Sequence, residues 1–101
     1  MNNDTKPLSR SEIDQELKTV SGWSFANNKI SKQFDFANFI SALNFINELA
    51  KFSEEIDHHP DIHIFYNKVI FDLQRFDAGG KVTARDFQVA KEIERRYKLT
   101  Q

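Results

Sequence analysis

The feature that most constrains the fold is a long apolar stripe in the middle of the chain. From Phe36 onward, apolar side chains recur at spacings of three and four, which is the period of an α-helix. Asp35 precedes the stripe as a good N-cap residue. Pro60 ends it, because proline disfavours helical geometry in the residue before it. We therefore predict a helix from about Phe36 to Asp57. Its apolar positions are Phe36, Phe39, Ile40, Leu43, Ile46, Leu49, Ala50 and Ile56.

A β-hairpin is predicted before this helix. Residues 23–25 begin a short strand, and Asn27-Asn28 is a turn signal because asparagine tolerates positive φ. The strand that returns from this turn alternates between its two faces. One face carries Ile30, Lys32 and Phe34.

A second hairpin is predicted after Pro60. Residues 62–66 and 69–74 have the composition of strands, and Asn67-Lys68 is predicted to form the tight turn between them. Residues 77–80, Asp-Ala-Gly-Gly, then form a loop. The inward positions of the last strand are Val69, Phe71 and Leu73.

Helices are also predicted near both ends of the chain. Ser9 and Glu12 have the spacing of a capping box, which places a first helix at residues 9–19. Thr83 caps a last helix, with Asp86 in the third position as a shorter stand-in for the usual glutamate. The resulting order is α-β-β-α-β-β-α. It predicts an α+β fold in which helices pack on one face of an antiparallel sheet.

Length and composition indicate one domain over residues 1–101, of which about residues 1–7 form a flexible tail. Fourteen basic and fifteen acidic residues give no sign of a nucleic-acid partner. The chain has no cysteine, which excludes a disulfide scaffold and thiolate chemistry. No signal peptide or apolar run long enough to span a membrane is evident. We expect a cytoplasmic protein.

The three histidines of the chain, His58, His59 and His63, fall within six positions. The end of a long helix carries partial negative charge, which favours a cationic imidazole. Glu54 lies four residues before His58, so the two can meet on one helix face. Because histidine both gives and accepts protons near neutrality, this segment is a candidate acid/base site.

Two other interpretations of the histidines stay open at this point. Adjacent histidines in a surface loop are often only solvated. The three rings could also supply nitrogen ligands to a metal. Against a metal site, the spacing matches no familiar zinc pattern, and His63 lies in a strand pattern where it can point away from the pair.

Several motifs together resemble the signature of the pterin-4a-carbinolamine dehydratases. The central one is Glu54-x-x-x-His58-His59-Pro60, followed at a short distance by an aromatic residue, Tyr66. The resemblance runs from about residue 8 to residue 98. Its other parts are Gly22-Trp23, Lys32-Gln33-Phe34-Asp35-Phe36, Asp77-Ala78-Gly79-Gly80 and Thr83-Ala84-Arg85-Asp86.

This resemblance implies a four-stranded antiparallel sheet with helices on one side, and a homodimer or homotetramer. It implies a hydro-lyase that converts 4a-hydroxytetrahydrobiopterin, a pterin-4a-carbinolamine, to quinonoid dihydropterin and water. That reaction recycles the cofactor of aromatic amino-acid hydroxylases, and needs no metal or redox cofactor. Some family members also serve as dimerisation cofactors for a transcription factor.

The resemblance also implies roles for individual residues. His58 would be the acid/base residue, because the 4a-hydroxyl leaves poorly until it is protonated. His59 would bind and orient the pterin, and Glu54 would orient the histidines. Asp57 is a weaker supporting candidate, and Pro60 would shape the pocket wall.

The chain departs from the family pattern at Phe76, where the family usually has a histidine and occasionally a tryptophan. Phenylalanine cannot transfer a proton; it can stack on a flat heterocycle or fill the wall. This predicts either reduced activity, or binding without catalysis in a protein-interaction module. The next residue, Asp77, either contacts the pterin or is a loop residue whose side chain forms a hydrogen bond with its own backbone.

Overall fold

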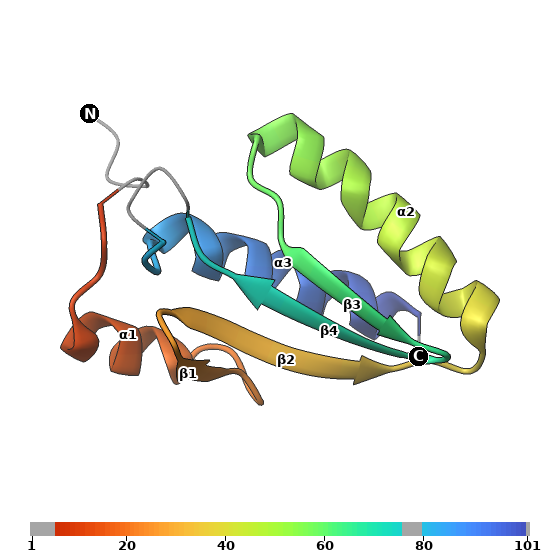
Figure 1. Cartoon of the computed structure of the whole chain (residues 1–101), viewed down its shortest axis with the longest axis horizontal. Coiled ribbons are helices and arrows are strands. Elements are labelled where there is room, and N and C mark those ends of the chain that lie inside the picture. Colours follow the sequence, from red (N-terminus) through yellow and green to blue (C-terminus); the bar gives the residue numbers. More distant parts are fainter. Residues whose placement is uncertain (1–5, 76–79, 101) are drawn as a thin grey trace.

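The computed structural model describes residues 6–75 and 80–100, and Figure 1 shows the arrangement of their helices and strands. The predicted order α-β-β-α-β-β-α is confirmed. The elements are α1 (Arg10–Leu17), β1 (Ser24–Ala26), β2 (Lys29–Asp35), α2 (Phe39–Ile56), β3 (Asp61–Phe65), β4 (Lys68–Leu73) and α3 (Ala84–Leu99).

The four strands form one antiparallel sheet in the order β1-β2-β4-β3. The two predicted hairpins are therefore joined through the pairing of β2 with β4, in which Phe34 lies opposite Val69 and Ile30 lies opposite Leu73. The expected α+β class with a four-stranded sheet is confirmed.

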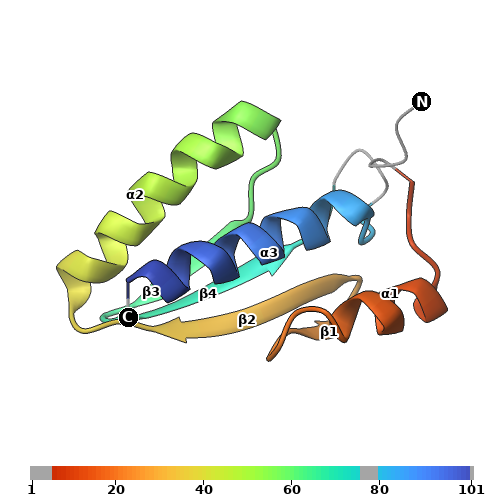
Figure 2. The same cartoon turned by 180° about the vertical axis from the view of Figure 1, so that it is seen from behind.

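The helices cover one face of this sheet. Figures 1 and 2 show α2 and α3 on the same side, and α1 contributes Ile13 to the same core. Because side chains alternate along a strand, one set from β2 and β4 is buried beneath the helices. These buried side chains are Ile30, Phe34, Val69, Phe71 and Leu73.

Edge-to-face aromatic pairs fill the centre of the core. The ring of Phe34 packs against Trp23, Phe71 and Tyr97, with centroid separations of 6.1, 5.8 and 4.8 Å. Such pairs add about 0.5–1.5 kcal/mol each beyond the burial of their area. Tyr97 belongs to α3, so these contacts fix the last helix against the sheet.

The predicted start of α2 is wrong by three residues. Asp35 is the last residue of β2, and the N–H of Phe36 donates to the Asn67 carbonyl at 2.8 Å. The backbone therefore stays bonded to the β3–β4 hairpin past the predicted cap. Asn38 caps α2 instead, and its Oδ1 accepts the Ser41 N–H at 2.8 Å.

Other boundaries need smaller corrections. The turn of the second hairpin is Tyr66-Asn67 rather than Asn67-Lys68, because Lys68 already pairs in β4. The Asn27-Asn28 turn is confirmed, with φ of 54° and 61°. The Ser9–Glu12 capping box is also confirmed. Pro7, which the sequence placed in the flexible tail, forms a bridge to Thr83.

Within residues 6–75 and 80–100, no helix combines the length and apolar character needed to cross a membrane.

Candidate functional site

The chain changes direction sharply where α2 ends. Asp57 follows the last helical residue and adopts the left-handed conformation, with φ 52° and ψ 47°. This conformation is uncommon for a residue with a Cβ. The N–H of the next residue, His58, donates to the Ser53 carbonyl at 3.1 Å and closes the turn. The two histidines therefore lie beyond the helix rather than on its face.

His58 is buried and held by a carboxylate of another helix. Its Nε2 lies 2.5 Å from Oδ1 of Asp86, and the two side chains are 5% and 0% exposed. The other oxygen of Asp86 accepts the Thr83 N–H at 2.8 Å, at the start of α3. One carboxylate thus caps a helix and orients an imidazole.

The chemistry of this contact favours one position for the hydrogen on the neutral ring of His58. An ionised carboxylate can only accept hydrogen bonds. The N-terminal end of α3 carries partial positive charge, which stabilises an anion there. Nε2 then donates to Asp86, and in the neutral ring Nδ1 is the acceptor. The arrangement can take up a proton on Nδ1 and stabilise the resulting imidazolium.

His59 is the exposed member of the pair. Its Nε2 lies 2.5 Å from Oε2 of Glu54, and the two side chains are 51% and 77% exposed. The sequence predicted that Glu54 would meet His58 one helical turn later, and this is wrong. An i,i+4 contact needs a continuous helix, whereas the left-handed Asp57 interrupts it. The carboxylate faces His59 instead.

His63 lies apart from the pair, as its strand position predicted. Its Nε2 is 2.9 Å from Oδ2 of Asp72, on the sheet face opposite the buried Phe71. Asp72 is buried and also accepts hydrogen bonds from Ser31 Oγ at 2.6 Å and Lys29 Nζ at 3.3 Å. Burial alone would raise the pKa of Asp72, but the bonds from Ser31, His63 and Lys29 outweigh it and lower that pKa below its usual value.

The three histidines therefore contact three different carboxylates. Across the described ranges 6–75 and 80–100, no group of three or more histidine, cysteine, aspartate or glutamate side chains is arranged to hold a metal ion. His58 and His59 are adjacent, whereas His63 contacts Asp72 on the other face of the sheet.

The remaining predicted residues are placed unevenly. Pro60 is half-buried directly after His59, and Asp57 is exposed. Phe76 and Asp77 lie outside the described residues. Sequence reasoning identified Asp86 only as a helix cap. Its contact with His58 depends on the packing of α3 against the end of α2, which no local sequence pattern encodes. The one sequence signal for Asp86 is its position in the Thr83–Asp86 motif.

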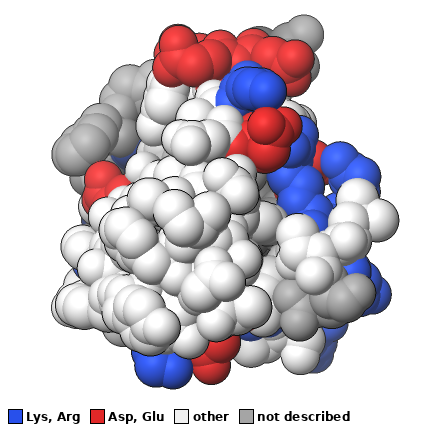
Figure 3. Space-filling model, turned by 90° about the vertical axis from the view of Figure 1, so that its right-hand side faces the viewer, with Lys and Arg blue, Asp and Glu red and all other residues white. Residues whose placement is uncertain are grey.

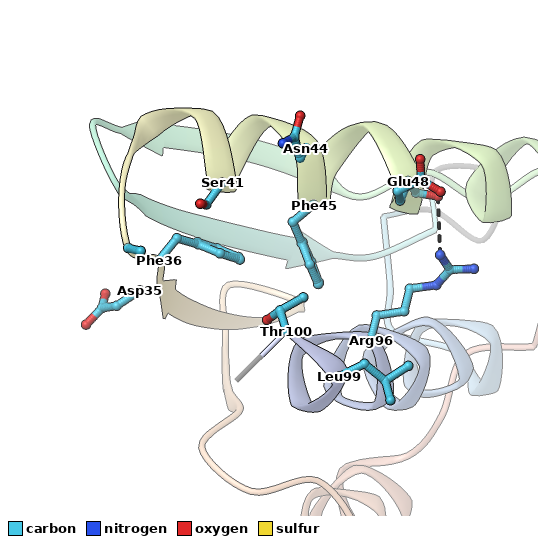
Figure 4. A pocket seen from close by; sticks show the side chains of 10 residues that line it. Asp35, Phe36, Ser41, Asn44, Phe45, Glu48, Arg96, Leu99 and Thr100 are labelled. Atoms are coloured by element: carbon cyan, nitrogen blue, oxygen red, sulfur yellow. Dashed lines mark hydrogen bonds between the residues drawn. The ribbon is translucent and has the colours of Figure 1, made fainter.

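A cavity lies at the other end of the helix pair. It has a volume of about 650 Å³ between the start of α2 and the end of α3, as Figure 4 shows. Arg96 extends from α3 towards α2, where Nη1 donates to the Glu48 carbonyl at 3.4 Å. No histidine is among its lining residues, which are Asp35, Phe36, Ala37, Ser41, Asn44, Phe45, Glu48, Arg96, Leu99 and Thr100. The chemistry of the histidine pair therefore does not belong to this cavity.

Comparison with known proteins gives this site a context. Residues 6–96 match the family described as pterin 4 alpha carbinolamine dehydratase. The chain belongs to this family. A candidate pterin-4-alpha-carbinolamine dehydratase of Sulfolobus acidocaldarius is 41% identical over 86 residues, which cover 85% of this chain and 93% of that protein.

Solved structures of similar proteins share the fold. A transcriptional coactivator/pterin dehydratase from Brucella melitensis superposes with a TM-score of 0.86 at 28% identity, over 91% of this chain and 99% of that one. A pterin dehydratase-like protein identified as a RuBisCO assembly factor in the alpha-carboxysome gives a TM-score of 0.64 at 20% identity. It covers 75% of this chain and 89% of the other, and at that identity it supports the fold alone.

Proposed function

We propose that the protein dehydrates 4a-hydroxytetrahydrobiopterin, or a related pterin-4a-carbinolamine, to quinonoid dihydropterin and water. The observation that carries this proposal is the His58–His59 pair, in which each imidazole contacts its own carboxylate at 2.5 Å. The pair occupies the position of the motif by which the sequence resembles the family. It brings two groups that can each exchange a proton to adjacent positions.

The reaction needs two proton movements. The bond between C4a and the hydroxyl oxygen breaks, and the hydroxyl leaves as water after it gains a proton. The neighbouring ring nitrogen loses a proton as its double bond to C4a forms. General acid and base groups each accelerate such steps by about 10²–10⁴-fold.

We assign the acid/base role to His58, at Nδ1, with Asp86 stabilising its imidazolium. His59 has the exposed ring that a pterin in solution reaches first, so it binds and orients the substrate while Glu54 orients His59. Asp57 and Pro60 flank the pair. Phe76 and Asp77 complete the proposed pterin contacts.

The proposal is tested by the decay of a 4a-carbinolamine produced by a hydroxylase. Purified protein is expected to accelerate this decay, and a rate equal to that in buffer contradicts the proposal. His58→Ala should lower kcat by roughly 10²-fold or more, whereas His59→Ala should raise KM more than it lowers kcat. Equal and small effects of the two substitutions would contradict the assigned roles.

The chain offers a matched control for these variants. His63 also contacts a carboxylate, but on the other face of the sheet. His63→Ala is therefore expected to leave kcat and KM unchanged. A loss of activity in this variant equal to that of His58→Ala would show that the assay reports folding rather than the site.

A second candidate function is a pterin-binding or protein-interaction module on the same fold. Phe76, where the family usually has a proton-transferring side chain, favours it, as does the coactivator named in the Brucella melitensis structure. Measured turnover together with the absence of a stable partner in a pull-down would reject it.

We further propose that the protein is a homodimer or homotetramer in the cytoplasm, where it would serve an aromatic amino-acid hydroxylase. Apolar exposure at one end of the molecule supports self-association. Figure 3 shows this end as a broad surface with few charged side chains. The segments that reach it in Figure 1 carry the exposed side chains Phe39, Ile40, Phe65, Tyr66 and Leu99. Sedimentation of the purified protein tests this, and a monomer would contradict it.

A further inference from the structure

Two consecutive residues in the first turn of α3 reach the end of α2. Asp86 contacts the ring of His58, as described above. Arg85, directly before it, donates from Nη1 to the Ile56 carbonyl at 2.9 Å. Ile56 is the last helical residue of α2. The first turn of α3 thus contacts both a side chain and a backbone carbonyl at the end of α2.

The contact made by Arg85 satisfies a group that the helix itself leaves open. The last four carbonyls of an α-helix have no partner within the helix, and they carry its partial negative charge. A guanidinium donor is well suited to such a carbonyl, because it is always charged and its donors are held in a rigid plane. Arg85 therefore ties the carboxyl end of α2 to the start of α3.

The turn at Asp57 lies directly after this bonded carbonyl. The left-handed conformation is less favourable for aspartate than for glycine, so contacts on both sides of the residue help to hold it there. The surroundings here are the His58 N–H bonded to the Ser53 carbonyl on one side and the Ile56 carbonyl bonded to Arg85 on the other. If the backbone of this turn changes conformation, the side chains of His58 and His59 point in directions other than those seen here.

We propose that Arg85 is a positioning residue of the site: it holds the Ile56 carbonyl and thereby the turn that aims His58 at Asp86 and presents His59. The inference rests on the proposed function for its kinetic consequence. The positioning effect of Arg85 can also be measured without turnover, from the stability of the hydrogen bond between His58 and Asp86.

The experiment compares the wild type with three variants of the full chain. Arg85→Met keeps most of the side-chain length but removes the donors. Arg85→Lys keeps the charge and a single donor group. Arg95→Met is the matched control, because Arg95 lies on the same helix but is exposed and pairs with Glu92, at 2.6 Å. Urea unfolding establishes that each variant is folded.

The first readout is the exchange of the His58 Nε2 proton with water, followed by NMR. Local opening of the turn exposes this proton, so exchange in Arg85→Met should accelerate by about tenfold or more. Arg85→Lys should be intermediate, and Arg95→Met should match the wild type. Exchange in Arg85→Met equal to that of the wild type would overturn the proposal, as would equal acceleration in Arg95→Met.

The second readout is kinetic and separates positioning from simple loss of stability. Misplaced catalytic groups lower turnover by roughly 10- to 100-fold, so kcat of Arg85→Met should fall by that factor while KM changes less. A fall in the fraction of folded protein would instead lower activity in proportion to the unfolding measured in urea, and such proportionality would contradict the proposal. If Arg85→Met does not fold, Arg85→Lys decides by the same two criteria. If the wild type shows no turnover, the proposed function is wrong. Proton exchange still tests whether the bond from Arg85 to the Ile56 carbonyl positions His58.

Discussion

At the scale of single residues, the site depends on one carboxylate with two tasks. Asp86 accepts the Thr83 N–H with one oxygen and contacts His58 with the other. Both tasks need an anion of this length at the first turn of α3. The sequence predicted the capping task from the spacing to Thr83. The second task could not be predicted, because it depends on a contact across 28 positions.

Replacement of Asp86 by asparagine tests both tasks at once. The amide keeps the shape but removes the charge that holds His58 with Nε2 as the donor. We expect a loss of about 1–3 kcal/mol in the free energy of unfolding, because a buried charged hydrogen bond is lost. Because Nδ1 is then no longer held as the acceptor, we also expect kcat to fall by at least about tenfold.

Asp14→Asn provides the control for this prediction. Asp14 is exposed and pairs with Arg10 on its own helix, and such surface changes stay within about 0.5 kcal/mol. Chemical unfolding and the decay assay measure the two effects. Wild-type stability and kcat in Asp86→Asn would refute the double role.

Asp72 should give the stability of the protein a measurable dependence on pH. Its pKa is lower in the folded protein than in the unfolded chain. Its contribution is therefore present above the unfolded pKa and is lost as the pH falls through the folded pKa. Asp72→Asn should be less stable than the wild type by about 1–3 kcal/mol at pH 7, and the difference should shrink below about pH 4. Urea unfolding at pH 7 and pH 3 measures it, and a difference that does not change with pH would disprove this account.

At the scale of elements, the two ends of α2 show where local pattern succeeds and fails. The apolar stripe predicted the helix and its end before Pro60. It did not place the start, because Asp35 and Asn38 are nearly equal as N-cap residues. The choice between them is made by the bond from Phe36 to Asn67, a residue 31 positions away in sequence. Glu54 faces His59 and not His58 for a different reason, because the left-handed Asp57 interrupts the helix before His58.

Alanine at each of the two candidate caps distinguishes the prediction from the structure. Asn38→Ala removes the oxygen that accepts the Ser41 N–H, and should cost about 1 kcal/mol. Asp35→Ala removes an exposed carboxylate that lies 3.5 Å from Lys68, and should cost less than about 0.5 kcal/mol. Thermal or urea unfolding compares the two. A larger loss in Asp35→Ala would mean that α2 begins where the sequence first placed it.

At the scale of the whole molecule, the fold sets apart three regions with different chemistry. The histidine pair lies where the end of α2 meets the start of α3, the 650 Å³ cavity lies at the opposite ends of the same helices, and the His63–Asp72 contact lies on the sheet face away from the helices. Local alternation predicted both hairpins, but the central pairing of β2 with β4 is a long-range contact. The resemblance supplied the four-stranded sheet that local patterns left open.

We propose above that this family member is a dehydratase whose chemistry depends on His58 and His59. The most direct measurement is the decay rate of a 4a-carbinolamine with the wild type and with the double variant His58→Ala/His59→Ala, both shown to be folded. We expect strong acceleration by the wild type and the buffer rate with the double variant. A wild type no faster than buffer, or a double variant as fast as the wild type, would contradict it.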